Sequence, residues 1–170
     1  MKSGPKAFAP VRLSAQQRVA AGALLWSLCA GWPAHAALGE SASSALDDGR
    51  VSRLMHMLRA DGGPRVADTT VVTPTGVVVH EYSGLLGVVF AIAWSGDAEP
   101  DLGRMFGAYY PVYEAWRRAH PMPELDSAVQ MRSRQLVAHV RSRGGGGSGS
   151  AYLPTLVPLG VDLAGLGVRP

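Results

Sequence analysis

One stretch of the chain, residues 69–106, constrains the fold most, because strand, turn and helix signals follow one another in it. Residues 69–73 and 77–82 are runs of β-branched and aromatic side chains, which favour strands. Pro74 and Gly76 lie between these runs at the second and fourth positions of a four-residue turn, a pattern typical of a type I turn. The two runs are therefore predicted to form a β-hairpin.

A third strand is predicted over residues 88–94, after a connection that contains Gly84 and Gly87. Glycines allow a tight or bulged turn, so the three runs are expected to form an antiparallel meander. Side chains alternate across a strand, which places every second residue on the same face. The large side chains of this strand are expected to share one face and to form the core: Val88, Phe90, Ile92 and Trp94.

Residues 1–36 have the three-part pattern of a secretory signal peptide. Four basic residues precede an uncharged run at 19–30, and the small-x-small sequence Ala34-His35-Ala36 follows it. We expect cleavage after Ala36, which would leave 134 of the 170 residues as a periplasmic or secreted protein. A membrane anchor is the alternative, but the apolar run is shorter than the about 20 residues that a transmembrane helix needs. No membrane span is therefore expected after cleavage.

The net charge of +3 originates in this leader. The mature chain would hold 12 arginines and 13 acidic residues, so it lacks the excess of cations that marks nucleic-acid-binding domains. Cys29 is the only cysteine and would leave with the leader, which excludes disulfides and thiol chemistry from the mature protein. A chain of this length can bury enough surface to fold as one domain without such links.

The N-terminal segment of the mature chain, residues 37–65, is predicted to hold one short helix. Residues 37–44 are small and polar, which is typical of a flexible terminus. Asp47 offers an N-cap, and Pro64 ends the pattern. Between them, apolar residues recur at helical spacing: Val51, Leu54, Met55 and Leu58.

Two helices are predicted after the meander. Pro100 can occupy the first position of one helix, and Pro111 must interrupt it because proline lacks a backbone donor. A second helix is expected over residues 111–119, with Glu114 placed to pair with Arg118 one turn later.

Aromatic residues recur at helical spacing around this second helix: Tyr109, Tyr113 and Trp116. They are the candidate partner-binding residues, as a platform for a sugar or a peptide. The alternative, which we favour, is that the rings cover the meander, because its large apolar face needs a second layer.

The C-terminal part is predicted to add strands and a glycine-rich loop. Residues 127–131 and 135–143 alternate as strands do, although a helix from Asp126 onward also fits their apolar spacing. Residues 144–150, Gly-Gly-Gly-Gly-Ser-Gly-Ser, are predicted to be a passive flexible connector. Residues 66–170 are thus predicted to form a single α+β domain. Its antiparallel sheet would hold a three-stranded meander plus one or two C-terminal strands, covered by one or two helices.

Five short motifs, taken in order, resemble a known family. They are His-Glu-Tyr at 80–82, Gly-x-Val-Phe-Ala-x-Ala-Trp-Ser-Gly at 87–96, Pro-Asp-Leu at 100–102, Ala-Tyr-Leu-Pro at 151–154 and Pro-x-Gly-Val at 158–161. With them the chain resembles domain of unknown function 2844, a family of small secreted proteobacterial proteins. The resemblance implies no activity, substrate or cofactor, and it assigns no catalytic residue.

No motif for metal, phosphate or nucleophilic chemistry is complete. His80 and Glu81 begin a zinc-protease motif, but Gly84 stands where the second histidine is needed. The acidic residues at 97–101 alternate like calcium ligands, yet an acidic helix start explains them better. The histidines of the mature chain are scattered, so no metal site and no cofactor are predicted: His56, His80, His120 and His139.

The sequence therefore predicts a class of function and no reaction. We expect a non-enzymatic exported domain that binds an envelope protein or polysaccharide, through aromatic residues or an open sheet edge, and we expect no nucleic-acid partner. The alternative is a small exported hydrolase that uses carboxylates such as Glu81 or Asp101. Its catalytic residues are unknown, because the sequence does not show which carboxylates meet in space.

Overall fold

The protein has an α+β fold in which an antiparallel sheet, with seven strands among the described residues, carries helices on one face. The computed structural model describes residues 37–42, 55–59, 64–121 and 127–170. The strand order is β1-β2-β3-β4-β7-β6-β5. The elements are β1 (Met55–Arg59), β2 (Arg65–Val72), β3 (Val78–Ser83), β4 (Val89–Gly96), α1 (Leu102–Phe106), η3 (Gly107–Tyr109), α2 (Tyr110–Ala119), β5 (Ala128–Arg132), β6 (Val137–Arg143) and β7 (Gly146–Tyr152).

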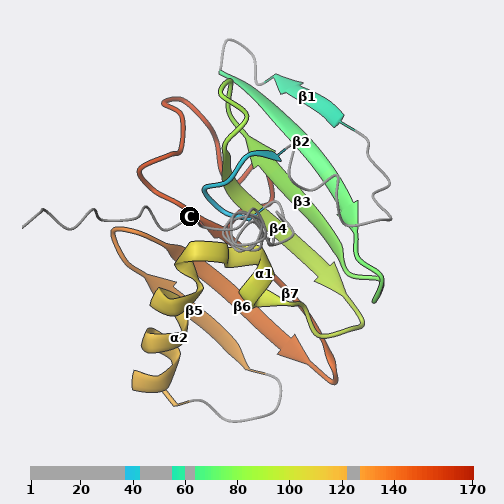
Figure 1. The fold of residues 1–170 in the computed structure, drawn as a ribbon, viewed down its shortest axis with the longest axis vertical. Coiled ribbons are helices and arrows are strands. Elements are labelled where there is room, and N and C mark those ends of the chain that lie inside the picture. Colours follow the sequence, from blue (N-terminus) through green and yellow to red (C-terminus); the bar gives the residue numbers. More distant parts are fainter. Residues whose placement is uncertain (1–36, 43–54, 60–63, 122–126) are drawn as a thin grey trace, which may run out of the picture. The chain divides into compact units, whose positions relative to one another are not determined.

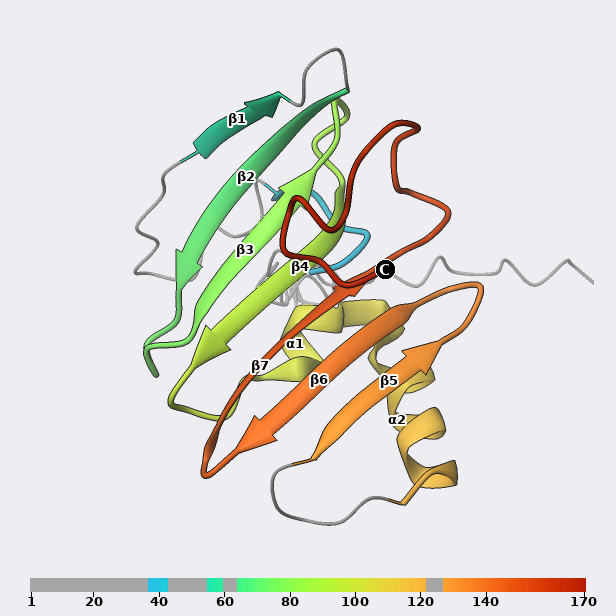
Figure 2. The same cartoon turned by 180° about the vertical axis from the view of Figure 1, so that it is seen from behind.

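The two faces of the sheet have different covers. The helices α1 and α2 lie against one face, which we call the helix face (Figure 1). The C-terminal segment, residues 153–170, crosses the other face, which we call the tail face (Figure 2). Among the described residues, two separate groups of buried apolar side chains correspond to these faces, and of the two only the group on the helix face includes helical residues.

The predicted meander is present as β2, β3 and β4, each paired antiparallel with the next. The turn between β2 and β3 is closed by Thr73, whose hydroxyl accepts a hydrogen bond of 3.0 Å from the backbone of Val77. Gly76 follows with a φ of +85°, a conformation that glycine adopts without strain. Local turn chemistry therefore accounts for this hairpin.

The glycine-rich segment is an interior strand, and the prediction of a passive loop at 144–150 is wrong. Gly144 and Gly145 have φ values of +48° and +94°, as a two-residue type I′ hairpin turn requires. From Gly146 onward the chain forms β7, which pairs with β6 on one side and β4 on the other. A Cβ atom at Gly149 would collide with the Trp94 ring and with the carbonyl oxygen of His139. Glycine is needed here for close packing rather than for flexibility.

The structure also decides between helix and strand for two segments of the chain. The helix predicted from Val51 to Leu58 is wrong over residues 55–59, which form the edge strand β1, while 51–54 lie outside the described residues. Pairing with β2 overrides the local helical spacing, since alternate residues of the same segment also fit a strand. The strand interpretation of 127–131 and 135–143 is confirmed by β5 and β6.

The helical region follows the sequence signals except at Pro100, which precedes the capping residue of α1 instead of occupying the first helical position. Asp101 caps α1 by accepting a hydrogen bond of 3.0 Å from the backbone of Arg104. Pro111 lies in the first turn of α2, where its missing donor costs nothing. Glu114 and Arg118 form the expected ion pair at 2.7 Å. In the part of the chain that the structure describes, no helix is long and apolar enough to cross a membrane.

The core differs from the prediction at one strand. Trp94 and Ile92 belong to the buried cluster on the helix face, but Phe90 belongs to the cluster on the tail face. On β3, the adjacent residues Tyr82 and Ser83 pair with Ala91 and Val89 of β4. Phe90 is left between these two partners as the extra residue of a β-bulge. The bulge shifts the alternation by one position. The expectation that Phe90 and Trp94 share a face is therefore wrong.

Residues 37–42 are ordered against the sheet, so the expectation of a flexible segment at 37–44 is wrong for them. Leu38 is almost fully buried in the cluster on the helix face. The backbone of Gly39 donates to Val89 at 2.8 Å, and Val89 donates to Glu40 at 2.9 Å. The predicted signal peptide, residues 1–36, lies outside the described residues.

Candidate functional site

A polar cavity of about 430 Å³ lies on the tail face over strands β3 to β5, and we call it the trough. Its size falls within the range of about 300–1,000 Å³ typical of ligand sites. The polar side chains that line it come from five strands and from the C-terminal segment: His80, Ser95, Gln130, His139, Arg141, Ser148, Ser150 and Arg169.

Strand register brings these residues together. Ser150 on β7 is paired with Ala93 on β4 and with His139 on β6, and the same row continues to His80 on β3 and Gln130 on β5. Neighbouring strands are about 4.8 Å apart, so the row from β3 to β5 extends over about 19 Å. Residues far apart in the sequence thus form one line across the sheet.

A second row runs beside the first. Ser148 on β7 is paired with Ser95 on β4 and with Arg141 on β6. The central positions of both rows are small, Ala93 and Ser95 on β4 and the two serines on β7. The larger polar side chains of the lining, such as His80, Gln130 and Arg141, come from the neighbouring strands β3, β5 and β6, so the floor over β4 and β7 is low.

The C-terminal segment closes one end of the trough. The backbone of Arg169 donates a hydrogen bond of 3.0 Å to the hydroxyl of Ser150, which is only 2% exposed. Arg132 donates to the carbonyl of Pro170 at 2.7 Å, and the hydroxyl of Tyr82 donates to Leu166 at 2.7 Å. These contacts hold the segment to the tail face and place Arg169 beside the trough.

The lining of the trough carries positive and no negative side chains among the described residues. Arg141 and Arg169 are both exposed. Burial, together with the charges of Arg132 and Arg169, lowers the pKa of His139 below its usual value, so this imidazole is neutral at neutral pH. Its Nε2 atom is buried and makes no hydrogen bond in the described part of the chain. The site is therefore suited to an anionic ligand.

A His-Asp pair stands at the β3 side of the trough. The Nδ1 atom of His80 lies 3.2 Å from a carboxylate oxygen of Asp68 and 3.3 Å from the hydroxyl of Thr70. Burial and the nearby Asp68 charge raise the pKa of Tyr82 to about 12, so its hydroxyl stays protonated. Thr70 is the one hydroxyl residue found in hydrogen-bond contact with His80 in the described part of the chain.

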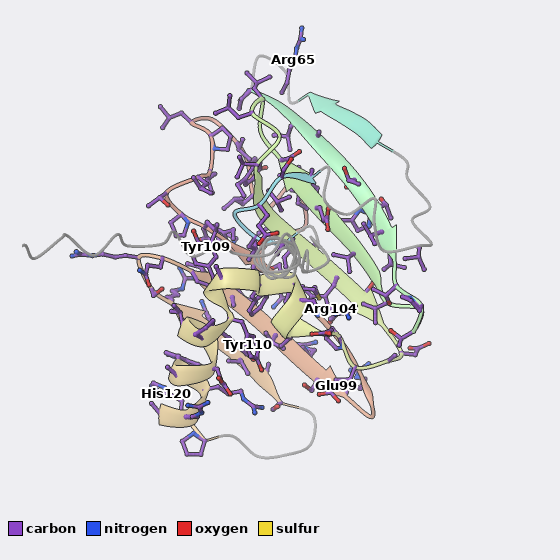
Figure 3. All side chains as sticks on the ribbon, viewed as in Figure 1. Arg65, Glu99, Arg104, Tyr109, Tyr110 and His120 are labelled. Atoms are coloured by element: carbon purple, nitrogen blue, oxygen red, sulfur yellow. The ribbon has the colours of Figure 1, made fainter. Side chains whose placement is uncertain are left out.

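The three aromatic candidates lie near the helices and apart from the trough. Tyr113 is 4% exposed and packs edge-to-face on Phe106 with ring centroids 5.2 Å apart, which makes it a core residue. Tyr109, labelled in Figure 3 on the segment between the helices, packs against Gly39. Trp116 is half-buried and stacks on His120 at 4.4 Å. Of the three, Trp116 keeps the most favourable position for a partner contact, and that role stays a prediction.

The carboxylates suggested for a hydrolase are not brought together in a cavity. Glu81 is 4% exposed and shares the helix face with Ile92, its neighbour on β4. Asp101 caps α1 and is largely exposed. Neither residue lines the trough or the second cavity, of about 700 Å³, that lies between α2 and the β6–β7 hairpin. Among the described residues, no group of three or more metal-ligating side chains is found.

Sequence reasoning missed the trough because its residues meet only through β7. In the sequence His80 and His139 lie far apart, and the composition of residues 146–150 predicts a loop. The signal that could have found the site is the alternation Ser148-Gly149-Ser150, which has the two-residue period of a strand despite its glycine-rich composition.

Comparison with known proteins gives a family and no characterised relative. The family model described as "Protein of unknown function (DUF2844)" matches residues 34–166. The match covers all of the strands and helices described above. The searches of characterised proteins and of solved structures returned no match.

Proposed function

The chain belongs to the family of proteins of unknown function DUF2844, and from that premise we propose that it is a non-enzymatic exported domain that binds another macromolecule of the cell envelope. The trough is the binding site. The observation that carries this proposal is a cavity of about 430 Å³ whose polar lining is made of arginine, histidine, serine and glutamine, without a carboxylate among the described residues. Such a lining supplies hydrogen-bond donors and positive charge to a ligand.

Export is supported by the leader itself. The basic residues, the uncharged run and Ala34-His35-Ala36 follow in the order of a signal peptide, with cleavage after Ala36. The family match begins at residue 34, and residues 37–42 are the first of the described residues to pack on the sheet. N-terminal sequencing of the protein from the periplasm or the medium should give Ala37 as the first residue. Recovery of the chain with Met1 in the cytosol would contradict export.

Binding is favoured over catalysis by how the titratable groups are arranged. General acid–base hydrolysis needs two groups that converge on one bond. Glu81 and Asp101 line neither cavity, and no carboxylate lines the trough among the described residues. The arginines of the trough have no such partner on its lining, and arginine is a ligand-holding group because it does not release its proton.

The test is capture of envelope material by the immobilised chain and three single variants. Arg141→Gln removes a charge from the trough, Arg104→Gln removes a charge from α1 as a matched control, and Trp116→Ala tests the aromatic site. We expect Arg141→Gln to lose the captured material, whereas the other two variants retain it. If Trp116→Ala loses capture and Arg141→Gln retains it, the binding site is the aromatic one and the proposed trough is wrong.

A further inference from the structure

Charge is divided unevenly along the mature chain. Residues 110–170 contain seven arginines and four acidic residues, whereas residues 37–109 contain five arginines and nine acidic residues. The balance near zero therefore conceals a basic part and an acidic part. All seven arginines of the basic part are exposed: Arg117, Arg118, Arg132, Arg134, Arg141, Arg143 and Arg169. A positive field of this kind attracts anionic ligands to that part of the surface.

The trough is lined both by arginines of this basic part and by small side chains on β4 and β7. Arg141 and Arg169 reach it from β6 and from the C-terminal segment, and His80 and His139 line it as well. A guanidinium presents its donors as a planar fork that matches a carboxylate in two parallel hydrogen bonds. The charged groups of the lining therefore select a ligand that carries carboxylates or similar anions.

The position of the trough within the sheet selects against a peptide strand. β4, β7 and β6 are interior strands, and each is paired on both sides. A peptide that binds by strand addition needs an open edge with unpaired backbone groups. β5, at the side of the trough, is an edge strand, but over the three interior strands recognition must come from side chains. The hydroxyls of Ser95 and Ser148 are exposed there, on the floor. A ligand that bears both hydroxyl and carboxylate groups meets these donors and the arginines together.

We propose that the ligand of the trough is an acidic polysaccharide, whose carboxylates are held by Arg141 and Arg169 over the floor formed by Ser95, Ser148 and Ser150. This inference rests on the proposed function and names the chemical class of its ligand. The row from His80 to Gln130 extends over about 19 Å, a length that suits a chain of sugars better than a single small anion. The low floor is essential, because large side chains at these positions would fill the space that a sugar ring needs.

Isothermal titration of the full chain, as the cell processes it, with oligomers of polygalacturonate tests the inference. We expect binding that weakens as salt is added, because exposed charges are screened. Arg141→Gln and Arg169→Gln should each weaken binding about tenfold or more, as expected for loss of a charged hydrogen bond. Arg104→Gln, on α1, should bind as the unaltered chain does. Arg169 lines the trough and not the second cavity, so its variant separates the two sites.

Three comparison ligands test the chemical class of the ligand that the trough binds. A neutral glucan oligomer, a poly-glutamate peptide and single-stranded DNA should each bind at least about tenfold more weakly than polygalacturonate. Equal binding of any of them, or binding of polygalacturonate that both trough variants leave unchanged, overturns the inference. If envelope capture depends on Arg141 while polygalacturonate does not bind, the ligand class is wrong and the proposed function stands. If neither depends on Arg141, both are wrong.

Discussion

The helix face and the tail face of the sheet are built by the same strands and have opposite contents. On the helix face, Trp94, Phe106 and Tyr113 form a chain of edge-to-face contacts beneath the helices. On the tail face, a smaller apolar cluster lies around Phe90 and Val168, and the trough over β3 to β5 has a largely polar lining. The comparison teaches that alternate residues of single strands can serve stability and ligand access separately.

β7 shows this division most clearly. Gly149 and Ala151 face the helix side, where the Trp94 ring and the core leave no room for larger groups. Ser148 and Ser150 face the trough, where small side chains keep the floor low. One strand is therefore poor in large side chains for two different reasons, packing on one face and space for a ligand on the other.

The largest expected effects come from truncating the main aromatic residue of each face. Trp94→Ala and Phe90→Ala should each lower the free energy of unfolding by about 3–5 kcal/mol, because transfer and cavity terms add. The two side chains belong to separate clusters, so the double variant should equal the sum to within about 0.5 kcal/mol. Denaturant unfolding of the three variants measures this. A coupling well above that limit would mean that the faces are one core.

A smaller effect should follow from adding one methyl group to the central strand. Gly149→Ala places a Cβ against the Trp94 ring and the His139 carbonyl, and we expect a loss of about 1–3 kcal/mol from overpacking. Ser148→Ala, one residue earlier and on the tail face, is the matched control and should stay within about 0.5 kcal/mol of the unaltered chain. Thermal unfolding of both variants measures this difference in stability. Equal stability of the two would contradict the assignment of faces on β7.

The parts of the fold that sequence predicted are those whose causes are local. The β2–β3 turn depends on Thr73 and Gly76, and the start of α2 is favoured by Pro111, and all of these act within a few residues. The strand interpretation of β5 and β6 also rested on local alternation. Such signals are readable because each is complete in one short segment.

The parts that sequence did not predict depend on partners far along the chain. β7 is a strand because β4 and β6 pair with it on both sides, which its glycine-rich composition does not indicate. The bulge at Phe90 is defined by its register with β3. The trough could not be predicted because its rows of residues cross β7. Its lining also includes Arg169 from the C-terminal segment, which is distant in sequence. A site assembled by long-range register could not be found from spacing alone.

A still smaller effect should distinguish the covered part of the tail face from the trough. Tyr82→Phe removes the hydrogen bond to Leu166 and should cost about 0.5–1.5 kcal/mol at neutral pH. Burial raises the pKa of Tyr82 from 10.0 to about 12, so between these values the unfolded chain has lost a proton that the folded chain keeps. The stability contributed by this group is therefore present below pH 10 and is lost as the pH rises toward 12. The free energy of unfolding, measured between pH 10 and pH 12, should fall less steeply with pH in Tyr82→Phe than in the unaltered chain.

The most direct test of the account is one variant that fills the trough and leaves the core alone. Ser148→Tyr adds a large side chain at an exposed position on the floor, and tyrosine is favoured in strands. We predict that the free energy of unfolding changes by no more than about 0.5 kcal/mol, whereas affinity for polygalacturonate oligomers falls about tenfold or more. Unchanged affinity in a folded variant, or a loss of stability as large as that of Gly149→Ala, would contradict the division between a closed helix face and an open tail face.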